Sequence, residues 1–194
     1  MPWPTQLNGV TLNFGSTPAP VFFVNANQAN FQVPFDAAGA VANVALTNNG
    51  SAANVVPVPL AATSPAVFSL QQTGFGPGAI LDTSFQVVSE ANPVPLGGVV
   101  QIFITGLGAV NPPIGDGEAA PAAEPFARVV DPDLQILFDG EAGTILFAGA
   151  APGFVGLYQV NVQLPTTGFV GPAVPVQVVT GNAFSDFVDI AVGL

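Results

Sequence analysis

The fold is decided by the stretch Gln28-Ala29-Asn30-Phe31-Gln32-Val33-Pro34, which recurs as Gln159-Val160-Asn161-Val162-Gln163-Leu164-Pro165. In both copies an amide side chain alternates with an apolar one. Because successive side chains of a β-strand point to opposite faces, this alternation predicts a half-buried strand, with the amides on one face and the apolar residues on the other.

The similarity extends to both sides of this stretch, which indicates an internal repeat. Upstream, Leu12-Asn13-Phe14-Gly15 and Val21-Phe22-Phe23 recur as Ile136-Leu137-Phe138-Asp139-Gly140 and Ile145-Leu146-Phe147. Downstream, the predicted strands Val41 to Thr47 and Val55 to Leu60 correspond to Ala173 to Val179 and Phe184 to Val192. The spacing grows from 124 residues (Leu12 to Ile136) to 131 (Gln28 to Gln159), so the second copy carries seven extra residues, which we place in the loop Gly149 to Gly156.

Glycine and proline occur along the whole chain, with 22 and 20 residues among 194. The longest run without either is Ala79 to Asn92, which leaves no room for a long helix. Short strands separated by frequent turn residues are typical of an antiparallel sandwich. Asn48-Asn49-Gly50 predicts a hairpin turn that needs positive φ, although Asn49-Gly50-Ser51 is also a formal glycosylation sequon.

We therefore predict an all-β fold, made of two tandem Ig-like antiparallel β-sandwich subdomains that are related by the internal repeat. The predicted domains are residues 1–110 and 131–194, and a Pro/Ala/acid-rich linker or loop at 111–130 joins them. The strand Val99 to Gly106 is expected to complete one of the sandwiches, so that the second domain shares strands from residues 64–110. The 16 phenylalanines are expected to fill the cores.

The charged residues exclude most kinds of catalytic and nucleic-acid site. One cation, Arg128, stands against 12 acidic residues, which gives a net charge of −11, and the chain has no His, Cys or Lys. Triads, nitrogen or sulfur metal sites and Schiff bases all lack their central residue, and one cation cannot neutralise a phosphate backbone. We predict no enzyme and no nucleic-acid binding. Because Pro, Gly, Asn and Gln interrupt every apolar stretch, we also predict no membrane insertion.

The amide rows are the first candidate site. Their side chains, which could bind sugar hydroxyls, are Gln28, Asn30, Gln32, Gln159, Asn161 and Gln163. Alternatively, the amides satisfy backbone groups at a sandwich edge or between the two copies. We favour this alternative, because sugar sites usually present exposed Trp or Tyr and this chain has only Trp3 and Tyr158.

A cluster of acidic residues is the second candidate site. Calcium binds six to eight oxygens and could bind among Asp116, Glu118, Asp131, Asp133, Asp139 and Glu141; no other cofactor is expected. The chain has no Asp-x-Asp-x-Asp-Gly loop, so solvated loop acids are the favoured alternative. A glycosidase would need two of these carboxylates in one cleft, and nothing in the sequence marks such a pair.

A family resemblance is carried by Phe147 to Val162 (FAGAAPGFVGLYQVNV), Gly106 to Pro112 (GLGAVNP) and Asp116-Gly117. These stretches resemble the uncharacterised Solibacter-type C-terminal domain family, which occurs at the C-terminal end of large secreted or surface proteins of acidobacteria. The first copy fits as well, through Gly15 to Pro20 and Gln28 to Pro34, but Asp139-Gly140 replaces an expected Gly-Gly turn. The resemblance implies an extracellular Ig-like module and transfers no catalytic residue.

These observations favour a non-catalytic extracellular structural module that assembles, with itself or with other surface-protein domains, into a cell-surface fibre or layer. So few charges leave the surface poorly protected against association. Val10 to Phe14 or Phe184 to Val192 could add as a strand to a neighbour's sheet. A glycan-binding adhesion module of a larger secreted protein is the alternative, and a carboxylate hydrolase comes third. The N-terminus shows no secretory signal, so an exported chain would have lost its signal or carry it upstream.

Overall fold

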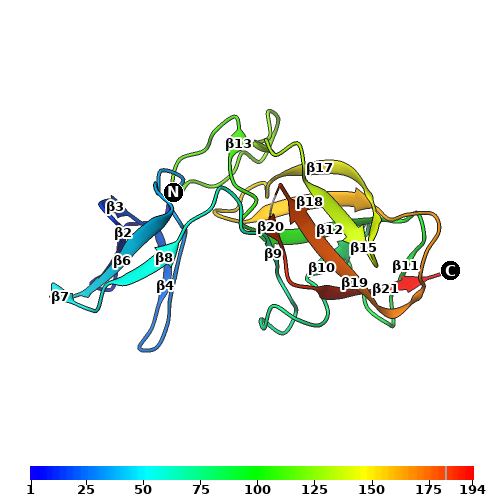
Figure 1. The fold of residues 1–194 in the computed structure, drawn as a ribbon, viewed down its shortest axis with the longest axis horizontal. Coiled ribbons are helices and arrows are strands. Elements are labelled where there is room, and N and C mark those ends of the chain that lie inside the picture. The colour runs from blue at the N-terminus through cyan, green and yellow to red at the C-terminus, as the bar shows by residue number, and fades with distance from the viewer. Residues whose placement is uncertain (182) are drawn as a thin grey trace. The chain divides into compact units, whose positions relative to one another are not determined.

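The computed structural model describes residues 1–181 and 183–194, and this part of the chain consists of strands and turns without a helix (Figure 1). The prediction of an all-β, sandwich-type fold is confirmed. The more specific assignment to Ig-like subdomains stays a prediction. The described residues accordingly offer no helix that is long and apolar enough to cross a membrane.

The chain folds into two compact units whose bounds differ from the predicted domains. The first unit consists of residues 1–62, 112–127 and 152–156, and the second of residues 63–111, 128–151 and 157–194. Most of the predicted linker at 111–130 is part of the first unit. Trp3 N donates to Gly117 O at 2.9 Å and Gly117 N donates to Gln32 Oε1 at 2.7 Å, so hydrogen bonds hold this segment in place.

The first unit contains a six-stranded sheet and a separate hairpin. The sheet has the order β1-β2-β6-β7, with β3 paired to β2 and β8 paired to β6; β4 and β5 form the hairpin. The strands are β1 (Gln6–Leu7), β2 (Val10–Phe14), β3 (Thr17–Pro18), β4 (Val21–Val24), β5 (Ala29–Phe31), β6 (Val41–Asn48), β7 (Ser51–Ala52) and β8 (Val56–Pro59). Leu12, Phe14, Ala19 and Ala42 form a small core. Asn49 and Gly50 have φ angles of 48° and 80°, which confirms the predicted hairpin turn.

The second unit is larger and has two main sheets. One has the order β10-β12-β18-β17-β14-β13, with β9 paired to β12, and the other has the order β11-β21-β19-β15-β16, with β20 paired to β19. The strands are β9 (Ala66–Val67), β10 (Ile80–Asp82), β11 (Val94–Pro95), β12 (Val99–Thr105), β13 (Val110–Asn111), β14 (Arg128–Val129), β15 (Gln135–Phe138), β16 (Glu141–Ala142), β17 (Thr144–Ala150), β18 (Tyr158–Gln163), β19 (Gly171–Thr180), β20 (Ala183–Phe184) and β21 (Val188–Gly193). The predicted strand Val99 to Gly106 is β12, which pairs with β18 in this unit as expected.

Alternating valines and isoleucines fill the core of the second unit. The first sheet buries Val100, Ile102, Ile104, Val160 and Val162, and the second sheet buries Ile136, Val174, Val176, Val178 and Ile190. The expectation of a phenylalanine-filled interior was wrong. Only Phe14 and Phe138 are buried, and both lie at strand positions that face a core.

Both units contain the same strand pairing in the same register, so the repeat seen in the sequence is also a structural repeat. In the first unit β2 pairs with β6 through Leu12 and Leu46, and in the second β15 pairs with β19 through Ile136 and Val178. The other strands correspond in order, with β3 to β8 of the first unit matching β16 to β21 of the second.

A β-bulge is repeated as well. The register shifts between Val21 and Phe23 in the β4–β5 hairpin, and it shifts between Ile145 and Phe147 in the β17–β18 hairpin. The extra residue of a bulge leaves the regular alternation of faces. Phe22 and Leu146, which lie at the two register shifts, are 59% and 54% exposed.

The repeated hairpins differ in what lies beside them. In the second unit β18 is flanked by β17 on one side and by β12 on the other. In the first unit β5 pairs with β4 alone. The first unit therefore lacks a counterpart of β12.

The two segments that were predicted to add to a neighbour's sheet are already paired within the chain. Val10–Phe14 is β2, which pairs with β6 on one side and with β1 and β3 on the other. β21 pairs with β19 on one side, while β11 and Pro77 occupy its other side. Because the hydrogen-bonding groups of both strands are used, neither strand is available to another molecule.

Candidate functional site

Each amide row begins with the same side-chain hydrogen bond. Gln28 Nε2 donates to Asn30 Oδ1 at 2.6 Å, and Gln159 Nε2 donates to Asn161 Oδ1 at 2.8 Å. Residues i and i+2 of a strand share a face, so this contact follows from the repeated Gln-x-Asn pattern. One of the four hydrogen bonds that each of these amides can make is therefore used within its own strand.

The third amide of each row bonds to nearby backbone. Gln32 is buried, and its Oε1 accepts from Gly117 N at 2.7 Å. Gln163 Nε2 donates to Gly97 O at 2.9 Å. These contacts match the alternative in which the amides satisfy neighbouring backbone groups. A role of the rows in sugar binding stays a prediction.

The acidic residues that were considered for calcium bond mainly to local backbone. Asp116 Oδ1 accepts from Phe35 N at 2.8 Å, Glu118 Oε2 from Gly115 N at 3.2 Å, and Asp131 Oδ1 from Asp133 N at 2.9 Å. Among residues 1–181 and 183–194, no three acidic side chains gather closely enough to hold a metal ion. Asp116 and Glu118 belong to the first unit, whereas Asp131, Asp133, Asp139 and Glu141 belong to the second.

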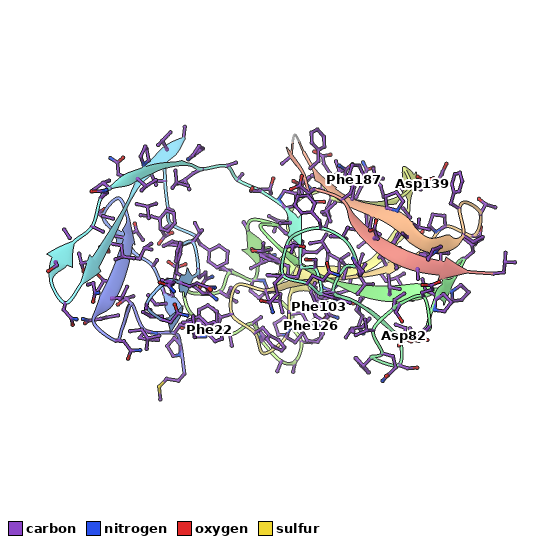
Figure 2. All side chains as sticks on the ribbon, turned by 90° about the horizontal axis from the view of Figure 1, so that it is seen from below. Phe22, Asp82, Phe103, Phe126, Asp139 and Phe187 are labelled. Atoms are coloured by element: carbon purple, nitrogen blue, oxygen red, sulfur yellow. The ribbon has the colours of Figure 1, made fainter. Side chains whose placement is uncertain are left out.

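An open hollow lies beside Asp139 on the second unit. Its volume is about 360 Å³, and it is lined by Leu137, Asp139, Gly140, Pro175, Gln177 and Phe187. The Phe187 ring is 56% exposed, and Figure 2 shows Asp139 and Phe187 on the same side of this unit. Gln177 Nε2 donates to Ser185 O at 3.1 Å.

This hollow has the chemistry of a binding surface. It offers one aromatic ring, one amide and one carboxylate, and a single carboxylate cannot supply the acid/base pair that glycoside hydrolysis requires. The sequence suggested Asp139 only as a calcium ligand and gave no indication of Gln177 or Phe187. The pairing of Leu137 with Gln177 between β15 and β19 brings these residues together, and no short motif encodes that pairing.

The outer edge of β5 is the most unusual feature of the first unit. Phe31 packs on the buried ring of Phe14, with centroids 5.8 Å apart, so its side chain faces the core of the unit. Phe31 is nevertheless 36% exposed, while its counterpart Val162 is fully buried. Since β12 covers the equivalent position of the second unit, the exposure of Phe31 follows from the missing strand.

Exposed phenylalanines are common on both units. The exposed set is Phe22, Phe23, Phe31, Phe35 and Phe154 on the first unit, and Phe68, Phe75, Phe85, Phe169, Phe184 and Phe187 on the second. Phe22, which is labelled in Figure 2, stacks on Trp3 with a centroid distance of 4.7 Å.

Asp82 and Tyr158 have shifted pKa values, and both shifts have structural causes. The Asn92 amide, with the backbone N–H groups of Gln86 and Ser84, stabilises the Asp82 carboxylate and lowers the pKa of that group. Burial raises the pKa of Tyr158 to about 12, and the Tyr158 hydroxyl donates to the carbonyl of Gly108. Both groups stabilise loops, and neither faces the hollow or the β5 edge.

Comparison of the chain with protein-family models, with curated proteins and with solved structures finds no match.

Proposed function

We propose that this protein is a non-catalytic structural module that works outside the cell by associating with copies of itself. The observation that carries the proposal is the unpaired edge of β5 in the first unit. The equivalent edge of β18 in the second unit is paired with β12. An unpaired strand edge with apolar residues beside it is a surface on which another strand can bind.

The distribution of charge supports the same proposal. Thirteen charged side chains are spread over a surface of 10381 Å², and eleven phenylalanines are exposed on it. Charged side chains are the usual protection of a protein surface against association. A surface with few charges and many exposed aromatic rings favours assembly.

The extracellular setting is part of the proposal and rests on the resemblance to the Solibacter-type family. A chain without cysteine or lysine has no disulfide or lysine-based covalent crosslink to hold an assembly together. Strand pairing and apolar packing would have to supply that strength. The lack of His, Cys and Lys likewise supports a role without catalysis.

Light scattering coupled to size-exclusion chromatography, over a wide range of protein concentration, tests self-association. We expect the mean mass to rise with concentration above the 19.5 kDa of one chain. Negative-stain electron microscopy of the most concentrated sample would then distinguish closed oligomers from fibres. A mass that stays at 19.5 kDa up to millimolar concentration would contradict the proposal.

Glycan binding is the second candidate, and the hollow at Phe187 favours it. The ring could stack on a sugar face, while Asp139 and Gln177 could accept or donate hydrogen bonds to hydroxyls. A glycan array probed with the wild-type chain and with Phe187→Ala tests this role. Binding that Phe187→Ala abolishes would support it, and an array without signal would remove it.

A further inference from the structure

We propose that the outer edge of β5 pairs with the same edge of a second copy, antiparallel, about a two-fold axis at Phe31. This inference rests on the proposed self-association and names the surface that makes the contact. Its basis is the hydrogen-bonding pattern of β5, the equivalent edge in the second unit and the lack of charged side chains on the strand itself.

The backbone groups available for this contact belong to Ala29, Phe31 and Val33. Asn25 N donates to Gln28 O and Gln32 N donates to Pro20 O, both at 2.9 Å, so the backbone of Gln28 and Gln32 faces the β4 side. Backbone groups alternate sides along an antiparallel strand, so the N–H and C=O groups of Ala29, Phe31 and Val33 point away from β4. In the first unit, which the structure describes completely, no backbone group bonds to that side.

The second unit shows what occupies such an edge when it is filled. Leu164, the counterpart of Val33, donates its N–H to Gly98 O at 2.8 Å. β12 then runs antiparallel to β18, with Val100 opposite Val162. The strand that fits β5 is therefore extended and antiparallel, and it has an apolar residue opposite Phe31.

β5 of a second copy meets each of these requirements. When Phe31 lies opposite Phe31 of the second copy, Ala29 lies opposite Val33, and the outward-pointing groups of both strands find partners. The apolar side chains then meet on the face that looks toward each core. On the other face, Asn30 lies opposite Gln32, whose side chain is buried and accepts from Gly117 N within its own chain.

The lack of charged side chains on β5 itself favours a second copy over a partner of different chemistry. Residues 1–35 contain no Asp, Glu, Lys or Arg. Edge strands of natural sheets usually carry lysines or inward-facing charges that prevent pairing with a like edge, and β5 has neither. The strand also offers no charge by which an oppositely charged peptide could be selected.

Sedimentation velocity over a concentration series tests this interface. We expect the wild-type chain to show a monomer–dimer equilibrium, and Asn30→Lys to weaken it about tenfold or more, because the two cations would then be diagonal neighbours on the same face, close to the axis. Two matched controls should keep the wild-type constant within about twofold. Asn30→Ser removes the contact with Gln28 without adding charge, and Asn43→Lys adds the same charge at an exposed position of β6.

Amide hydrogen exchange of the same samples reports on the strand itself. The N–H groups of Phe31 and Val33 should exchange more slowly as the wild-type concentration rises, and Asn30→Lys should remove this effect. Circular dichroism verifies that each variant is folded.

Each other outcome has a distinct meaning. Association that Asn30→Lys does not weaken, with unchanged exchange at Phe31 and Val33, would overturn this interface and leave self-association standing. A chain that is monomeric at every concentration would overturn both. Filaments that grow past the dimer and are blocked by Asn30→Lys would overturn the two-fold pairing, because β5 would then accept a different strand.

Discussion

Phe31 and Val162 hold the same position in the repeated hairpin, yet one is 36% exposed and the other is fully buried. Phe31 is paired with Val21 and Val162 with Ile145, at the residue before the bulge in both cases. The difference arises on the opposite side of each strand, where only Val162 has a partner, Val100 of β12. The hairpin of the second unit therefore has a neighbouring strand at this edge, whereas the hairpin of the first unit has none.

Tyr158→Phe should destabilise the second unit by about 1–3 kcal/mol, because the Gly108 carbonyl loses the hydroxyl that donates to it and stays partly buried. Urea denaturation of the wild-type chain and of the variant measures the difference in the free energy of unfolding. Tyr158 is the only tyrosine, so no second hydroxyl can obscure the result. Equal stabilities would show that water replaces this hydrogen bond.

Alkaline pH should destabilise the wild-type chain through the same residue. The pKa of Tyr158 is about 12 in the folded protein and about 10 in an unfolded chain, so the unfolded state loses this proton first. The contribution is fully present below pH 10 and is lost as the pH rises to 12. Thermal melts of Tyr158→Phe should lack this loss, and absorbance near 295 nm reports the ionisation of the single tyrosine directly.

Asp82→Asn should loosen the turn that runs from β10 to Asn92. Asp82 Oδ2 accepts from Asn92 Nδ2 at 3.0 Å. In the variant an amide nitrogen replaces this oxygen, so two hydrogen-bond donors would face each other and the bond would be lost. The lowered pKa of Asp82 means that its contribution is present at neutral pH and is lost as the pH falls through the folded pKa.

The melting temperature of Asp82→Asn should therefore be lower than that of the wild-type chain at pH 7, and the two should converge in acid. Asp133→Asn makes the same change of charge on another loop of the second unit and serves as the control. A difference that persists unchanged at the lowest pH would show that the charge of Asp82 is not the cause.

Gly106→Ala should be strongly destabilising. Gly106 has a φ of +77°, and an added Cβ would lie 1.9 Å from the backbone oxygen of Ser64, so the backbone itself would have to move. We expect a loss of at least about 3 kcal/mol in the free energy of unfolding. Gly171→Ala meets nothing within 4 Å and should change stability by less than about 0.5 kcal/mol.

The regular part of the fold was predictable because the repeat encodes it twice. The amide and apolar alternation of Gln28 to Val33 and Gln159 to Leu164 correctly indicated the paired strands, and Asn49-Gly50 marked a true turn. The contact of each Gln with the Asn two residues later also follows from strand geometry.

The unit bounds were not predictable from the same signals. The segment 112–127 has no hydrophobic periodicity. It is held in the first unit by backbone hydrogen bonds such as that from Trp3 N to Gly117 O, and almost any residue could make such a bond. The exposure of Phe23 was also not predictable, because the register shift after buried Val21 pairs Phe23 with Asn30, on the face opposite to that of Phe31. The hollow at Phe187 and Gln177 depends on pairing between distant strands, which local patterns do not encode.

The path of the chain sets a limit on how this molecule can be cut and recombined. The backbone passes from one unit to the other after residues 62, 111, 127, 151 and 156. A gene fragment that ends at residue 62 loses the turn at Gly117 that anchors Trp3 and Gln32. Neither unit can therefore be excised as one continuous segment of the chain.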